Sequence, residues 1–301
     1  MRAFFARRLL WLSSRLPLRF NHAIGALLGR IIYRYSDRYR ELSRRNIARC
    51  FPEWSEVQRE ELVRNSLIEA GKSILESGAL WLWTPQAVMA KVRKVSGGEM
   101  LQQAMAEGKG VIFAAPHLGA WEVIGLYGSV HWPMTSLYRP LRLAGLDKLI
   151  RAGRERAGAR LVPTDASGVR ALFKALANGD LVGILPDQDP GPDAGVFAPF
   201  FGVTANTMTL LTRLVRKTGA RVFFAYAERL SQGQGYHVHF IPAPDGLTSA
   251  NIEQAAASLN KGVEACVRQL PVQYQWAYER FKTQPETGAD VNQGDTQKTA
   301  D

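Results

Sequence analysis

The sequence predicts an α/β fold, in which a mixed, largely parallel sheet is flanked by helices and preceded by an amphipathic helical segment. From about residue 97 onward, short apolar runs bounded by Gly, Pro or Asp alternate with stretches of helical periodicity. Such alternation is typical of a layered sheet with helices on its faces. Before that point, the first 50 residues mix arginine with apolar side chains at helical spacing. With 301 residues, 46% of them hydrophobic, the chain can bury such a core.

The N-terminal part predicts two amphipathic helices, near residues 3–16 and 21–36. A basic stretch at 38–50 follows them, and Pro52 then breaks the chain. After Lys282 the chain is polar and lacks apolar periodicity, so its end is expected to be disordered. We therefore divide the chain into an arm at 1–50, an α/β domain at 51–282 and a tail at 283–301.

A long helix is expected at the start of the α/β domain. Ser55 and Gln58 have the spacing of a capping box, in which each side chain bonds a backbone N–H of the other residue. Apolar residues then keep roughly helical spacing up to Trp81. Pro85 either ends this helix or starts a short new one.

Four short apolar runs predict buried strands, and helical patterns lie between them. The stretch 231–235 fits a hairpin loop between the last two runs, so at least one antiparallel pair is expected. The runs cover residues 111–115, 181–185, 221–226 and 236–241, and the helices are expected at about 119–130, 143–156, 167–177, 206–218 and 250–269.

The positive charge is concentrated in the arm. Residues 1–50 hold twelve arginines against Asp37 and Glu41, a net charge of +10 out of +11 for the whole chain. Because these arginines are interleaved with Trp, Phe and Leu, the arm suits the headgroup boundary of an anionic bilayer. Arginines interrupt every apolar window long enough to cross a bilayer, so peripheral attachment is expected, with a single span or a buried helical layer as alternatives. A nucleic-acid partner is not expected, because no nucleic-acid-binding motif accompanies the charge.

The stretch from Ala115 to Glu122 has the clearest chemical pattern. His117 follows an expected buried strand, and Glu122 falls in the first turn of the next helix. At such a corner the Glu122 carboxylate is expected to accept a hydrogen bond from one imidazole nitrogen, leaving the other as a base. The helix N-terminus would favour the negative charge that develops during acyl transfer to a hydroxyl. By itself, however, H-x4-E is a weak pattern, since a lone His beside a strand is more often structural.

Other polar residues have simpler interpretations. Asp187 and Asp189 could bind a metal, but the following Pro-Gly-Pro favours a plain turn. His237 and His239 alternate onto one strand face and could bind zinc, yet no third ligand is near in sequence, so a solvated strand face is favoured. We therefore expect no metal and no cofactor. The two cysteines lack metal-ligand or redox spacing and are expected to be buried, reduced thiols: Cys50 and Cys266.

Six sequence blocks follow one another over about residues 1–282. They are Arg45–Glu53, His117–Glu122, Leu137–Leu141, Gly153–Arg156, Asp187–Gly191 with Val196–Gly202, and Gln275–Phe281. Together they resemble the N-[LI]-x-x-C-F-P-E, H-x4-[DE], Y-R-P, arginine-helix, D-Q-x-x-G…F-x-P-F-F-G and Q-W-x-Y-x-R-F motifs of the bacterial lipid A biosynthesis lauroyl/myristoyl acyltransferase family. Six blocks in order are far more specific than any single one.

The resemblance implies transfer of a fatty acyl chain from acyl-acyl-carrier-protein to a hydroxyl of a hydroxyacyl chain on a lipid A precursor. No covalent acyl-enzyme is expected, since the acceptor hydroxyl can attack directly. The resemblance also implies that the N-terminal arm attaches the protein to anionic lipids at the cytoplasmic face of the inner membrane.

The resemblance assigns roles to individual residues as well. His117 would be the general base and Glu122 its orienting partner. Arg139 and Arg154 would bind acceptor phosphate or the oxyanion, although the residues alone would favour surface ion pairs for them. Asp187 and Glu228 would support the site.

Two other functions stay open from the sequence. The same chemistry could act on another phospholipid or glycolipid acceptor, and the chain could be a non-catalytic membrane- or lipid-binding protein. A serine hydrolase is not expected, because no G-x-S-x-G elbow occurs. A nucleotide-dependent enzyme lacks support as well, since neither G-x-x-x-x-G-K-[ST] nor G-x-G-x-x-G occurs.

Overall fold

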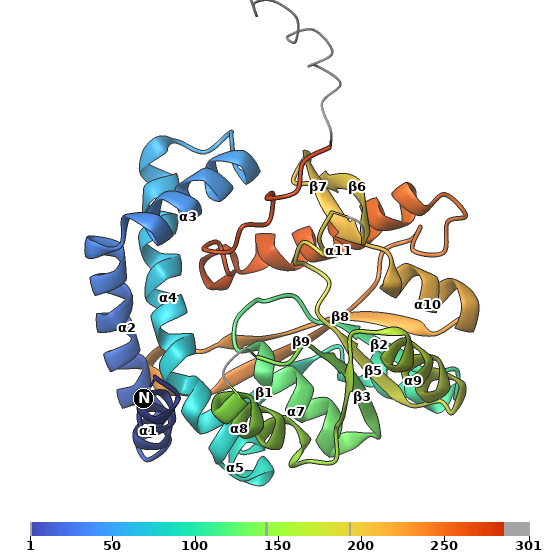
Figure 1. Cartoon of the computed structure of the whole chain (residues 1–301), viewed down its shortest axis with the longest axis horizontal. Helices are drawn as coiled ribbons and strands as arrows, with labels where there is room; N and C mark the ends of the chain where they lie inside the picture. Colours follow the sequence, from blue (N-terminus) through green and yellow to red (C-terminus); the bar gives the residue numbers. More distant parts are fainter. Residues whose placement is uncertain (1, 142–143, 193, 286–301) are drawn as a thin grey trace, which may run out of the picture.

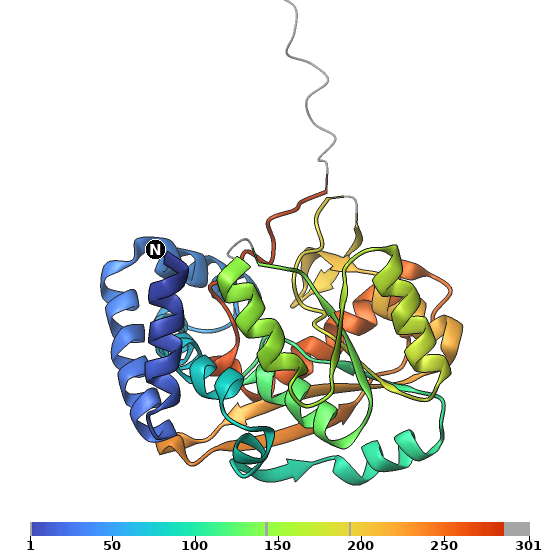
Figure 2. The same ribbon diagram turned by 60° about the horizontal axis from the view of Figure 1, so that its bottom comes forward.

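The computed structural model describes residues 2–141, 144–192 and 194–285. A seven-stranded sheet lies between two layers of helices, and the N-terminal helices pack beside it (Figures 1 and 2). The predicted α/β class, with a largely parallel sheet flanked by helices, is confirmed. Most of the expected disordered tail, residues 286–301, lies outside the described residues.

The strands form one large sheet and one small hairpin. Their bounds are β1 (Val92–Ser96), β2 (Val111–Ala114), β3 (Met134–Tyr138), β4 (Arg160–Pro163), β5 (Leu181–Ile184), β6 (Gly195–Phe200), β7 (Val203–Met208), β8 (Arg221–Arg229) and β9 (Tyr236–Pro242). The large sheet has the order β1-β9-β8-β2-β5-β3-β4, and β6 pairs with β7 alone. All neighbours in the large sheet run parallel except β8 and β9, the antiparallel pair expected around the loop at 231–235.

The helices agree with most of the predicted segments. They are α1 (Arg2–Ser14), α2 (Leu18–Tyr35), α3 (Asp37–Cys50), α4 (Glu56–Leu82), α5 (Pro85–Met89), α6 (Gly98–Ala106), α7 (Trp121–His131), α8 (Ala144–Glu155), α9 (Ala166–Ala177), α10 (Leu210–Thr218) and α11 (Ile252–Gln269), with short 3-10 turns at Ser231–Gly233 and Pro271–Gln273. Both hydrogen bonds of the capping box at Ser55 are present, and Pro85 starts the short α5.

Some elements differ from the prediction. The basic stretch at 38–50 forms the helix α3, one face of which buries Ile47 and Cys50 in the core of the domain. The helix expected at 206–218 begins only at Leu210, because residues 203–208 pair with β6. The unpredicted strands are edge strands or carry polar residues: β1 and β4 have exposed charged residues, and β3 has a Thr-Ser pair. Such strands lack the apolar run that marks a buried one.

The sheet is buried on both faces. Alternate residues of β2 point to opposite cores, so Ile112 lies in one hydrophobic cluster and Phe113 in the other. The first cluster receives side chains from α9, α10 and α11, and the second from α6 and α7. This arrangement leaves the ends of the strands, with the loops that follow them, as the places where polar side chains can gather.

The N-terminal helices pack closely against α4. Gly25 and Gly29 of α2 face Gly71 of α4, and a Cβ on Gly71 would lie 2.2 Å from the Gly25 carbonyl oxygen. Helices α1–α3 also expose large apolar side chains: Leu9, Trp11, Leu12, Phe20, Ile24, Leu27, Ile31, Tyr35 and Tyr39. Within the described ranges, no helix combines the length and apolar character required to cross a bilayer.

A buried ionic cluster joins these helices to the sheet. Glu76 of α4 accepts hydrogen bonds from Arg229 of β8, and its Oε2 lies 3.0 Å from His22 Nε2 of α2. Burial by itself would raise the pKa of Glu76, but the charge of Arg229 and the hydrogen bonds from His22 and Arg229 lower it to about 2. Glu76 is therefore ionised at neutral pH, and its charge is compensated.

Candidate active site

The register of β2 and β5 brings His117 and Asp187 together. The two strands are parallel neighbours in which Ala114 is opposite Ile184, and each polar residue follows its strand by three positions. Carboxyl ends of neighbouring parallel strands lie at the same edge of a sheet, so residues at equal distances beyond them come close together. The pairing is thus a direct consequence of the strand register.

Asp187 holds the His117 imidazole in a defined orientation. One carboxylate oxygen accepts the His117 backbone N–H at 2.8 Å, and the other lies 2.9 Å from His117 Nδ1. The Gln188 side-chain amide lies 3.2 Å from His117 Nε2. An amide NH₂ can only donate, so Nε2 is the acceptor and Nδ1 carries the proton that Asp187 accepts. In this tautomer the free lone pair of the imidazole is on Nε2.

The electrostatic environment keeps Asp187 ionised. Its side chain is only 2% exposed, and burial alone would raise its pKa. The charge of His117 and the hydrogen bonds from this residue outweigh burial, so the pKa of Asp187 is lowered. A buried carboxylate in this state favours the imidazolium that forms when His117 takes a proton.

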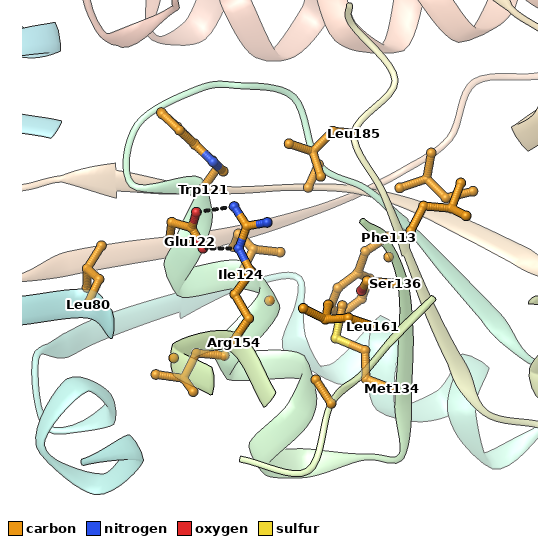
Figure 3. A pocket seen from close by; sticks show the side chains of 18 of the residues that line it. Leu80, Phe113, Trp121, Glu122, Ile124, Met134, Ser136, Arg154, Leu161 and Leu185 are labelled. Carbon is orange, nitrogen blue, oxygen red and sulfur yellow. Dashed lines mark hydrogen bonds and ion pairs between the residues drawn. The ribbon is translucent and has the colours of Figure 1, made fainter. Parts of the chain in front are cut away.

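The expected hydrogen bond between His117 and Glu122 is not the one that forms. Glu122 accepts two hydrogen bonds from Arg154 of α8, one of them from Nε at 2.9 Å (Figure 3). The loop between the two residues explains the difference. Gly119 has a φ of +61°, and the Ala120 N–H donates to the Ala227 carbonyl of β8 at 2.8 Å. The chain turns there before α7 begins, and Glu122 in its first turn is paired with α8.

Glu122 and Arg154 form a partly buried ion pair, with side-chain exposures of 11% and 32%. Burial would raise the pKa of Glu122, but the charge and hydrogen bond of Arg154 lower it. The electrostatic interaction with His117 lowers the pKa of Glu122 as well, so the two residues influence each other without a hydrogen bond. The α7 N-terminus has no side-chain cap, which leaves its partial positive charge available to an anion.

The other two candidates, Arg139 and Glu228, belong to neither of these pairs. Arg139 is exposed in the loop after β3. Glu228 lies near the end of β8, where its carboxylate contacts His237 and His239 of β9. Of the six candidates, His117 is thus paired with Asp187, and Glu122 with Arg154.

Two pockets meet at Trp121. The first, which we call the Arg154 pocket, encloses about 700 Å³ including space open to solvent, and Figure 3 shows its mostly apolar lining. The second, the His117 pocket, has a volume of about 910 Å³, also including space open to solvent, and lies between the site and helices α2, α3 and α4. Trp121 lines both, and its ring centroid is 5.2 Å from that of His117. The His117 pocket is also lined by Ile32, Tyr39, Leu67, Ile74 and Tyr274.

Small residues set the width of the Arg154 pocket. Gly125 of α7 lines it, and a Cβ there would meet no heavy atom within 4 Å. Gly183 of β5 also lines it, but a Cβ there would lie 2.5 Å from Met134 Cε and 2.6 Å from Ser136 Oγ. A side chain at Gly125 would therefore fill the pocket, whereas one at Gly183 would displace its wall.

Comparison with known proteins assigns the chain to a family. Residues 2–283 match the model of the bacterial lipid A biosynthesis acyltransferases. The chain is 32% identical to a lipid A biosynthesis lauroyltransferase of Escherichia coli K12 over 278 residues, 92% of this chain and 90% of the relative. It is 30% identical to a lipid A biosynthesis palmitoleoyltransferase of the same organism, over 93% and 91% of the two chains. A lipid A biosynthesis acyltransferase of Haemophilus influenzae is 32% identical, over 93% and 88%. The chain therefore belongs to the bacterial lipid A biosynthesis acyltransferase family.

Proposed function

We propose that this enzyme transfers a fatty acyl chain from acyl-acyl-carrier-protein to a hydroxyl of a hydroxyacyl chain on a lipid A precursor. The observation that carries the proposal is the His117–Asp187 pair, of which His117 lines a largely apolar pocket, in a chain of this acyltransferase family. A hydroxyl and a thioester can react directly when a base and an oxyanion-stabilising dipole are positioned beside them.

In the proposed reaction His117 Nε2 takes the proton of the acceptor hydroxyl, replacing its contact with Gln188. The alkoxide oxygen attacks the thioester carbonyl, a carbon–oxygen bond forms, and the carbonyl oxygen becomes negatively charged. When the tetrahedral intermediate collapses, the carbon–sulfur bond breaks and the imidazolium returns the proton to the leaving thiolate. Asp187 stabilises the imidazolium in between. Because the alcohol attacks directly, no acyl-enzyme forms.

Glu122 and Arg154 are proposed to act together. Glu122 lies in the first turn of α7 and Arg154 in the last turn of α8. The carboxylate of Glu122 fixes the Arg154 guanidinium at the wall of the Arg154 pocket. The uncapped N-terminus of α7 supplies a partial positive charge for the oxyanion. Loss of Glu122 would release Arg154 and leave a partly buried cation without its partner.

The two pockets are proposed to hold the two substrates. The Arg154 pocket has a mostly apolar lining of side chains from both helices and sheet, which suits the donor acyl chain. The His117 pocket opens among α2, α3 and α4, whose outer surface exposes apolar residues and carries the positive charge of the arm. An acceptor lipid could reach His117 from a membrane bound by that surface, and exposed Arg139 is available for its phosphate. We place the enzyme peripherally at the cytoplasmic face of the inner membrane, on anionic lipids.

The test is mass spectrometry of lipid A from cells with the wild-type gene, without it, and with His117→Ala. We expect the wild type to add the mass of one acyl chain and His117→Ala to match the deletion. The purified variant should keep the melting temperature and vesicle binding of the wild type. An unchanged lipid A profile on deletion, together with altered masses of another phospholipid or glycolipid, would replace the proposed acceptor. Normal acylation by His117→Ala would refute the role of His117.

A further inference from the structure

Three side chains that can bind a metal converge on one face of the β8–β9 hairpin. The antiparallel register places Glu228 opposite His237, and His239 follows two residues later on the same face of β9. One ligand atom from each of the three residues lies within 4.8 Å of the other two. The two histidines alone lack a third ligand, and the hairpin supplies it from the neighbouring strand.

We propose that Glu228, His237 and His239 form a zinc site. Two His and one Glu, with a fourth position left for water, are a donor set found in zinc enzymes. With metal–ligand bonds of about 2.0–2.1 Å, the ligand atoms of a tetrahedral site lie roughly 3.4 Å apart. Glu228 Oε2 lies 3.5 Å from His237 Nδ1 and 3.1 Å from His239 Nε2. Both separations are close to those that a bound ion requires.

The surroundings of the histidines are those of metal ligands. Ser96 Oγ of β1 lies 2.9 Å from His237 Nε2, the ring nitrogen that points away from Glu228. Ligating histidines ordinarily donate their second N–H to such an oxygen, which fixes the ring and its tautomer. The His239 ring stacks on Tyr226, with centroids 4.5 Å apart and planes 9° from parallel. Both imidazoles are therefore held in place before an ion arrives.

The accessibility of the site and its donor atoms also suit a divalent ion of the zinc type. Side-chain exposures of 14% for His237, 17% for His239 and 33% for Glu228 leave a path from solvent. Two nitrogen donors favour Zn²⁺ over Mg²⁺ or Ca²⁺, which prefer oxygen.

The zinc site would be separate from the His117–Asp187 pair but connected to it through the backbone. Glu228 follows Ala227, whose carbonyl accepts the Ala120 N–H in the loop that carries His117. An ion bound between β8 and β9 would cross-link the hairpin one residue from that anchor. Metal binding at this hairpin does not depend on the proposed acyl transfer.

The test uses the purified full-length protein after treatment with a chelator. Co²⁺ is titrated in while the visible absorption of a tetrahedral complex is recorded, and Zn²⁺ is then added in competition. His239→Gln and Glu228→Gln each remove one proposed ligand, and Ser96→Ala removes the hydrogen-bond partner of His237. His131→Gln is the matched control, because His131 is exposed on α7 and lies outside the cluster.

We expect the wild type and His131→Gln to give the tetrahedral spectrum and to lose it on addition of Zn²⁺. Removal of a ligand should weaken Zn²⁺ binding by more than tenfold, and Ser96→Ala should weaken it by about tenfold or more. The metal-free variants should match the wild type in circular dichroism; if one ligand variant is unfolded, the other and Ser96→Ala decide the question. No tetrahedral spectrum in the wild type, or unchanged Zn²⁺ affinity in the folded ligand variants, would overturn the proposal.

Discussion

Replacing Asp187 by Asn should nearly abolish acyl transfer while keeping the shape of the site. Asp187 accepts from both the backbone N–H and the Nδ1–H of His117, at 2.8 and 2.9 Å. An Asn side chain offers only one oxygen. If that oxygen keeps the backbone N–H, the NH₂ group faces Nδ1 and forces the imidazole proton onto Nε2, the atom that must act as the base. The reverse orientation places two donors against each other.

The size of the effect follows from the tautomer. The equivalent change in Ser-His-Asp enzymes lowers kcat by about 10⁴, and 10³–10⁴ here corresponds to about 4–5 kcal/mol of transition-state stabilisation. The assay is kcat for acyl transfer by the purified Asp187→Asn variant, with a melting temperature to show that it is folded. Glu122→Gln is the informative comparison, because it retains the His117–Asp187 pair and weakens only the contact with Arg154. A folded Asp187→Asn variant within tenfold of the wild-type kcat would refute the assignment of Asp187.

Three further predictions concern the acyl pocket, stability and the membrane. Gly125→Leu should shift donor preference toward shorter acyl chains relative to Gly125→Ala, because each methylene that no longer fits the pocket loses about 0.8 kcal/mol of binding free energy. The same donor preference in both variants, measured with competing donors, would contradict the assignment of this pocket to the acyl chain. At pH values above 4.5, the pKa of Glu76 in the unfolded chain, ionised Glu76 should contribute about 3 kcal/mol to the free energy of unfolding, and this contribution should be lost as pH falls through the folded pKa of about 2. Urea unfolding should therefore show that the difference in free energy of unfolding between the wild type and Glu76→Gln shrinks as pH falls. A difference that stays constant with pH would contradict this. Ile24→Asp in the arm should weaken sedimentation of the protein with anionic vesicles. Met100→Asp on α6 is the matched control and should not weaken it, although both side chains are 46% exposed. If both variants sediment equally weakly, the arm is not the surface that contacts the membrane.

The pairing of His117 with Asp187 has a signal in the sequence that local spacing does not contain. Each follows a proline after a short apolar run, as Ala115-Pro116-His117 and Leu185-Pro186-Asp187. Equal offsets from two buried strands place residues side by side when the strands are parallel neighbours. The spacing of H-x4-E instead suggested a local pair with Glu122, because a short motif relates only residues that are close in sequence.

Local patterns were sufficient to predict the α/β class, the main strands and helices, the basic apolar arm and the place of His117 at a strand end, because periodicity, caps and charge are local properties. Which side chains face each other depends on how the elements pack in three dimensions. Strand order paired His117 with Asp187, the packing of α7 against α8 paired Glu122 with Arg154, and the β8–β9 register gave His237 and His239 a third ligand. Contacts between residues distant in sequence depend on the order and register of the elements, which no local pattern specifies.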